Sequence, residues 1–209
     1  MGLAGIADEK VLRGPWLHGA KVRFETWQVP PPDDPAEALE VKHTAVFLTT
    51  HADFAEDLGR LVCETSLSES ARVLVPAVAS KSSEMMRQAL LKHPLCKLAF
   101  WVRDGATWRR SWQTGEVMRF AAELLVLEQL VKRSAAAYKQ LGFPDVAAEI
   151  AGKQALTRGW IEELVKAARS LGFDALQGHE IDRHSGGAPI ARPWLAVFRA
   201  DVLDAPAWR

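Results

Sequence analysis

Hydrophobic and polar positions change their spacing along the chain, and these changes predict its elements. Beyond the first forty residues, short apolar runs at 44–50, 72–78 and 96–102 alternate with stretches at 52–64 and 82–91 in which apolar residues recur every three or four positions. Short apolar runs are typical of strands, and the longer spacing is typical of amphipathic helices. Strands and helices that alternate in this way predict βαβ units and a largely parallel sheet.

The first forty residues lack this regularity. Residues 22–29 alternate between apolar and polar side chains, which predicts one strand with a single buried face. The stretch 30–35 holds four prolines in six residues, and proline neither donates to a sheet nor continues a helix. We therefore expect residues 1–40 to form an N-terminal extension with one strand and a proline-rich connection, and residues 41–209 to form a single domain.

Residues 97–112 are predicted to form a β-hairpin. They contain Asp104-Gly105, a dipeptide that favours the tight type I′ turn because both of its central residues need a positive φ. Strands at about 97–103 and 106–112 would flank this turn. A hairpin at the edge of an otherwise parallel sheet makes the sheet mixed, which is a common arrangement.

Two long helices are predicted next, at 116–141 and 145–170. Each is followed by a Gly-Phe pair, in which glycine adopts the left-handed conformation that stops a helix and phenylalanine supplies the accompanying hydrophobic contact. The short connection makes the two helices an antiparallel helical hairpin. A polar loop at 177–193 and a strand at 194–199 follow.

Together these elements predict an α/β fold. Its mixed sheet contains a β-hairpin, and the long C-terminal helical hairpin packs on one face of the sheet. An α+β fold with a purely antiparallel sheet is the alternative.

The predicted β-hairpin would place unusual chemistry on one of its faces. Because strand side chains alternate, three tryptophans and three cations would share that face: Lys97, Trp101, Arg103, Trp108, Arg110 and Trp112. Interleaved aromatic and cationic groups can stack on bases and neutralise phosphates, or anchor a protein partner. The alternative is that the tryptophans belong to the core, with the arginines lying over their rings.

A second candidate site lies at the carboxyl ends of the predicted parallel strands, where open α/β sheets bind ligands. His51 and Asp53 could act there as an acid–base pair. Lys81, Ser82 and Ser83 open a predicted helix, whose free N–H groups favour an anion. Asp53 and Ser82 are equally well explained as N-caps, and no glycine-rich phosphate loop is present.

Residues 178–187 hold two histidines and two carboxylates, namely His179, Glu180, Asp182 and His184. Imidazoles and carboxylates can bind zinc, but this spacing matches no metal-binding signature. We therefore expect a solvated loop, no structural metal and no cofactor. The glutamates of the two long helices, Glu162 among them, lack the Glu-x-x-His motif of a di-iron bundle.

Composition restricts the class of protein further. Lys plus Arg and Asp plus Glu both total 26, so the chain has no net charge and a broad nucleic-acid-binding surface is disfavoured. The hydrophobic share of 48% is that of a soluble globular protein. No apolar run approaches the ~20 residues of a membrane span, and residues 1–10 show no secretion signal. We therefore expect a cytoplasmic protein that does not contact a membrane. Cys63 and Cys96 lie in apolar runs, which predicts inert thiols.

For function, the sequence favours a non-catalytic binding or accessory protein that acts through the Trp/Arg face of the predicted β-hairpin. Its partner would be a protein or a single-stranded nucleic acid. The motif search finds no nucleophile, ligand set or phosphate loop, which argues against an enzyme. The alternative is a small-ligand enzyme that binds an anionic substrate at the strand ends. A buried tryptophan face would remove the first hypothesis.

Overall fold

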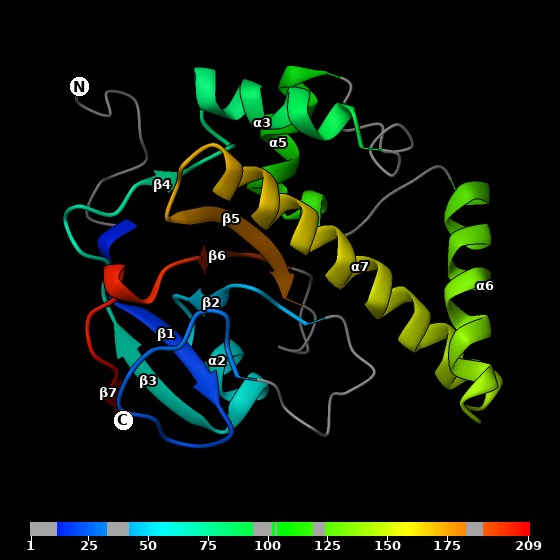
Figure 1. Cartoon of the computed structure of the whole chain (residues 1–209), viewed down its shortest axis with the longest axis horizontal. Coiled ribbons are helices and arrows are strands. Elements are labelled where there is room, and N and C mark those ends of the chain that lie inside the picture. Colours follow the sequence, from blue (N-terminus) through cyan, green and yellow to red (C-terminus); the bar gives the residue numbers. More distant parts are fainter. Residues whose placement is uncertain (1–11, 33–41, 94–101, 103, 119–123, 183–189) are drawn as a thin grey trace.

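The computed structural model describes residues 12–32, 42–93, 102, 104–118, 124–182 and 190–209. Its centre is a seven-stranded sheet with the strand order β4-β5-β6-β2-β1-β3-β7 (Figure 1). The strands are β1 (Trp16–Ala20), β2 (Val46–Thr49), β3 (Leu61–Thr65), β4 (Val73–Leu74), β5 (Ala175–Asp182), β6 (Ile190–Val197) and β7 (Ala207–Trp208).

The sheet is mixed, as predicted, but the predicted βαβ series is wrong. Only β4 and β5 pair in parallel, and every other neighbouring pair is antiparallel. The helix predicted over 52–64 ends at Gly59. The next residue, Arg60, has a φ of 62° and turns the chain directly into β3. β2 and β3 both pair antiparallel with β1, so they run parallel to each other, but β1 lies between them and they are not hydrogen-bonded neighbours.

Five α-helices lie in the described part of the chain: α2 (Ala52–Gly59), α3 (Lys81–Leu91), α5 (Gly105–Thr114), α6 (Leu124–Gln140) and α7 (Asp145–Ser170). The prediction of a helix ending at Leu91 is confirmed, but its N-cap is Ser80, whose side chain accepts a hydrogen bond from the Ser83 N–H. The prediction for α7 is confirmed over its whole length.

The helix stops at the Gly-Phe pairs are also confirmed. Gly142 and Gly172 have φ values of 87° and 77°. The Phe143 N–H donates to the Tyr138 carbonyl at 3.2 Å, which is the six-to-one bond of a Schellman stop. Helices α6 and α7 pack together, and a Cβ on Gly152 would lie only 2.9 Å from the Ala135 nitrogen. Small residues therefore let the two helices approach closely.

The β-hairpin predicted at 97–112 is wrong, because the described part of this segment is helical. The Asp104 carboxylate accepts a hydrogen bond from the Thr107 N–H at 2.7 Å and caps α5. Aspartate is as favourable at an N-cap as in a tight turn, so Asp104-Gly105 suits both structures. A helix places Trp108 and Trp112 on one face, and their exposed fractions are 1% and 0%.

The sheet does contain a β-hairpin, but a different one. β5 and β6 pair antiparallel from Ala175 with Val197 to Asp182 with Ile190. The polar loop predicted at 177–193 is therefore wrong over its described residues. Its polar side chains misled the prediction because the far ends of both strands are only half-buried.

Residues 22–29 form no strand, although they alternate. The Trp27 indole N–H donates to the Asp204 carbonyl at 2.8 Å, and the Phe24 ring packs against Trp208 at 5.0 Å. The apolar side chains of this segment thus pack on His18 of β1 and on the C-terminal segment, although its backbone pairs with no strand of the sheet.

The two faces of the sheet are covered differently. Register partners Leu17, Thr49 and Trp194 point to one face, which α2 covers at the β1–β3 end and α7 covers near β5. Helices α3 and α5 pack on this face as well, through a core that includes Trp112 and Trp160. The N-terminal and C-terminal segments cover the opposite face. Helices α2 and α7 thus pack on different parts of the same face of the sheet (Figure 1).

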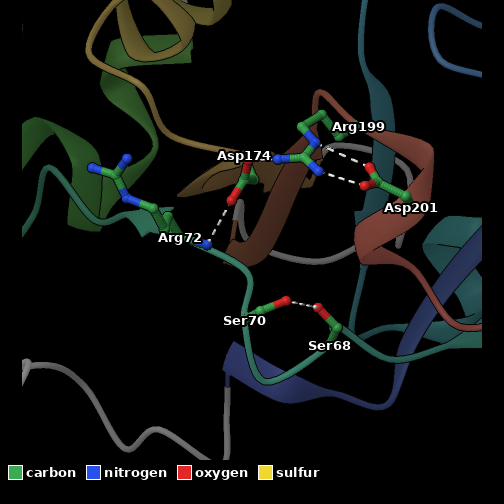
Figure 2. A network of polar contacts seen from close by, with 6 residues as sticks. All are labelled: Ser68, Ser70, Arg72, Asp174, Arg199 and Asp201. Carbon is green, nitrogen blue, oxygen red and sulfur yellow. Dashed lines mark hydrogen bonds and ion pairs between the residues drawn. The ribbon is translucent and has the colours of Figure 1, made fainter.

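A polar cluster ties the ends of β4, β5 and β6 together (Figure 2). The buried Asp174 carboxylate accepts from the Arg72 backbone N–H at 2.9 Å and pairs with the Arg199 guanidinium at 3.0 Å. Arg199 also pairs with Asp201. Because one carboxylate joins three segments, this cluster is a structural clamp for the edge of the sheet.

Candidate functional site

An open cleft of about 470 Å³ lies between α2 and α7. Strands β1, β2 and β6 form its floor, and the two helices form its walls. Its polar lining comes mainly from α7 and from the segment before β2. The principal lining residues are Leu17, Gly19, His43, Phe47, Thr49, Phe54, Leu58, Lys153, Thr157, Arg158, Ile161, Glu180 and Trp194.

The α2 wall is held against β1 by backbone contact. A Cβ on Gly19 would overlap the Ala55 carbonyl oxygen, and a Cβ on Gly59 would overlap the Ala20 nitrogen. Only glycine at both positions lets the helix lie this close to the strand. Since α2 has eight residues and α7 lies over another part of the sheet, the floor between them is left open.

The floor of the cleft is aromatic and apolar. The rings of Phe47 and Trp194 lie 5.4 Å apart, and Trp194 is buried. His43 packs edge-on against Phe47 with ring centroids 4.6 Å apart. The aromatic strip from Trp194 therefore ends at an imidazole.

The α7 wall changes from polar to apolar along the helix. Lys153, Thr157 and Ile161 follow one another at steps of four and so share a face, and all three line the cleft. Ile161 is buried, whereas Lys153 is exposed and forms no ion pair with any residue that the structure describes. A ligand on the apolar floor would thus lie beside the ammonium group of Lys153 and the hydroxyl of Thr157.

His43 is held by a buried carboxylate. Its Nδ1 lies 3.0 Å from Oε1 of Glu162, which is 5% exposed. Thr44 donates to the same carboxylate twice, from its backbone N–H at 3.1 Å and from its hydroxyl at 2.7 Å. Burial alone would raise the pKa of Glu162, but the hydrogen bonds from His43 and Thr44 outweigh it and hold the pKa below its ordinary value.

The predicted acid–base pair of His51 and Asp53 is not assembled. The His51 Nδ1 lies 2.9 Å from the Thr50 hydroxyl, whereas the Asp53 carboxylate pairs with Arg192 of β6 at 3.1 Å. His51 occupies the N-cap position of α2, and Asp53 lies in the first turn. The N-cap interpretation of Asp53 is therefore also wrong.

The predicted anion site at the start of α3 lies apart from His51 and Asp53. Lys81 is exposed at the start of α3 and Ser82 is half-buried. The buried Ser83 hydroxyl donates to the Pro76 carbonyl at 2.7 Å and accepts from the Trp108 indole at 3.1 Å, so it is used in packing. Strands β5 and β6 separate the ends of β2 and β4 by three strand spacings, roughly 14 Å.

The predicted Trp/Arg surface is likewise corrected where the structure describes it. Trp108 and Trp112 belong to the core because α5 turns them toward α7 and the sheet, and Arg110 is exposed on another face of that helix. Lys97, Trp101 and Arg103 lie outside the described residues. Buried indoles cannot stack on bases or anchor a partner.

The predicted polar loop contributes one residue to the cleft. Glu180 lines it from β5, whereas the His179 Nδ1 lies 3.1 Å from the Trp112 carbonyl. His184 lies outside the described residues. Within the described ranges, no three His, Cys, Asp or Glu side chains are grouped to hold a metal ion. Burial raises the pKa of the Cys63 thiol to about 11.

Sequence reasoning missed His43 and misjudged Glu162. They are 119 residues apart, so no local motif joins them. One signal was present: Glu162 directly follows Trp160 and Ile161 and precedes Leu164 and Val165 on the buried side of a long helix. A carboxylate at such a position is almost always paired, which predicts a specific partner.

No protein-family model, no curated protein and no solved structure matches the chain. Within the described ranges, none of the helices has the length and apolar character needed to cross a membrane.

Proposed function

We propose that this protein binds a small amphipathic organic molecule in the cleft between α2 and α7. The observation that carries the proposal is a cavity of about 470 Å³ with an aromatic floor and a polar α7 wall. Ligand sites are typically clefts of ~300–1,000 Å³ that are mostly apolar and contain a few convergent polar groups. The proposal keeps the small-ligand hypothesis and moves its site from the strand ends to this cleft.

The lining supports a ligand with two chemically different ends. An apolar or aromatic body fits against the half-buried ring of Phe47, with the buried rings of Phe54 and Trp194 beside it, because aromatic faces pack well against apolar groups. A polar end fits near His43 and Lys153, which supply hydrogen-bond donors at the rim.

A macromolecular partner, either a protein or a single-stranded nucleic acid, has less support. The tryptophans that motivated it at 108 and 112 are buried. A cytoplasmic location remains part of the proposal, because the two cysteines of the sequence suit a reducing compartment.

The test is a fragment screen followed by two matched variants. A library of small aromatic acids, amides and alcohols is titrated against the protein, and binding is followed by ligand-observed NMR. Thr157→Phe places a ring in the cleft and is expected to abolish binding of the hits. Ala137→Phe adds the same ring at an exposed position of α6, away from the cleft, and is expected to leave binding unchanged. Hits that bind both variants equally would show that the cleft is not the site.

A further inference from the structure

We propose that His43, oriented by Glu162, is the anion anchor of the cleft, and that the ligand is an organic anion with an apolar body. The inference rests on the proposed function and adds the chemical class of the ligand. It is carried by the position of one imidazole between a buried carboxylate and the open cleft.

The hydrogen bond to Glu162 decides which nitrogen of His43 faces the ligand. A carboxylate can only accept, so Nδ1 carries the proton that joins it to Oε1 at 3.0 Å. Nε2 forms no hydrogen bond with any residue in the described part of the chain. When the ring takes up a proton, Nε2 becomes a second donor and can bind an anion in the cleft.

Glu162 is suited to hold a charged imidazole in place. Its two oxygens accept three hydrogen bonds, from the ring and from the N–H and hydroxyl of Thr44. Its position on α7 is fixed by the buried neighbours Trp160 and Ile161. A buried carboxylate bonded to Nδ1 restricts the orientation of the ring.

The charges near His43 suit a ligand with one negative charge. Lys153 and Arg158 of α7 and Glu180 of β5 line the same cleft. Lys42 precedes His43 in the chain, and the Arg169 guanidinium donates to the Thr44 carbonyl at 3.0 Å. Glu162 neutralises the imidazolium, and Lys153, which forms no ion pair with any described residue, adds a positive charge at the rim that can pair with the ligand.

The proton balance makes the inference measurable. Wherever the imidazole of the unliganded protein is neutral, the protein, the anionic ligand and one proton from solvent combine into one complex. Binding then weakens about tenfold for each unit of pH increase, because one proton is taken up per ligand. If the contact between His43 and Glu162 only joined α7 to the segment before β2, the affinity for the ligand would not depend on pH.

The experiment compares 2-naphthoate with its neutral analogue 2-naphthamide, by calorimetry at pH 6.0 and pH 8.5. We expect 2-naphthoate to bind at least tenfold more tightly at pH 6.0, with proton uptake visible as a difference between two buffers. We expect 2-naphthamide to bind equally at both values. His43→Gln should remove the pH dependence of 2-naphthoate binding, and 2-naphthamide should bind this variant with equal affinity at both pH values.

The matched control is His93→Gln. His93 also pairs with an α7 carboxylate, Glu163 at 3.4 Å, but it does not line the cleft, so this variant should keep the wild-type pH profile. Glu162→Gln tests the positioning role and should weaken 2-naphthoate binding at pH 6.0, because an amide keeps only one of the two accepting oxygens that hold His43 and Thr44. If it fails to fold, His43→Gln alone decides the question.

The outcomes separate the two proposals. Equal, pH-independent binding of both probes would overturn the anchor and leave the cleft as a binding site. Binding of 2-naphthoate that survives in Thr157→Phe would overturn the cleft as its site. Absence of binding by both probes would overturn both proposals.

Discussion

The two walls of the cleft are held in place by different means. Helix α2 has eight residues and rests on β1 through Gly19 and Gly59, where no side chain fits. Helix α7 has 26 residues, is held by side-chain packing along its inner face, and reaches the segment before β2 through the Glu162 carboxylate. A wall set by backbone contact tolerates no added atoms, whereas a wall set by side chains depends on particular polar partners. Substitutions can test this difference directly.

The largest effect is expected at the α2 wall. Gly19→Ala would place a methyl group on the Ala55 carbonyl oxygen, so α2 must move or β1 must bend. Overpacking against backbone should lower the free energy of unfolding by about 3 kcal/mol or more. Chemical denaturation followed by circular dichroism measures the change.

Gly159→Ala is the matched control on α7. A Cβ at Gly159 would meet nothing within 4 Å, and alanine is a better helix former than glycine. We expect this variant to stabilise the protein by about 0.5–1 kcal/mol. Similar unfolding midpoints for the two variants would contradict the close contact between α2 and β1.

The next largest effect is expected at the α7 wall. Glu162→Ala removes the buried acceptor of three hydrogen bonds and leaves the half-buried donors of Thr44 and His43 without it. We expect a loss of about 3 kcal/mol. Glu163→Ala removes a carboxylate that pairs at the surface with Lys166 and His93, and should change stability by about 0.5 kcal/mol or less. Equal losses would show that Glu162 is no more than a surface carboxylate.

The strand beneath α2 carries a pH dependence of its own. His18 of β1 points to the opposite face, where its Nδ1 lies 2.9 Å from the Phe47 carbonyl oxygen. Burial lowers the pKa of His18 below its ordinary value of 6.5, and the bond to Phe47 offsets this only in part. The unfolded chain then binds a proton that the folded protein does not, so stability should fall as the pH drops below about 6.5.

Unfolding midpoints between pH 8 and pH 5 measure this dependence. His18→Asn should flatten the fall below pH 6.5, and His93→Gln should leave it in place. The lowered pKa of Glu162 acts in a more acidic window, since its contribution is present above its ordinary pKa of 4.5 and is lost at lower pH. An unchanged slope in His18→Asn would show that another group carries the effect.

The smallest effect is expected at the ion pair between α2 and β6. The Asp53 side chain is mostly exposed, and its 3.1 Å pair with Arg192 is therefore screened by water. Asp53→Asn should change the free energy of unfolding by about 0.5 kcal/mol or less, and salt should reduce even that. A loss above 2 kcal/mol would mean that α2 is held by charge as much as by its contact with β1.

The functional residues could be predicted less well than the fold class. The helical hairpin follows from the period of the hydrophobic positions, which each segment carries within itself. The mixed pairing of the sheet was predicted from a hairpin at Asp104-Gly105, but it comes instead from the pairing of strands far apart in the chain. The cleft does not, because its floor comes from β1, β2 and β6, which are neighbours only in the folded sheet. His43 carries no local sign of its role, and Glu162 is recognisable only as a carboxylate in need of a partner.

By itself, the sequence determined where the long helices end, where α3 ends and which residues form α7. Those structures depend on contacts within a few residues, such as the glycines that take positive φ at 142 and 172. Tertiary structure decided whether Asp104-Gly105 turns a hairpin or begins a helix, since both are locally favourable and only the burial of Trp108 and Trp112 separates them. It also decided that 61–65 is a strand, because pairing with β1 buries Val62 and Cys63. Local signals act over one turn of chain, whereas strand order and buried pairs are settled by the whole core.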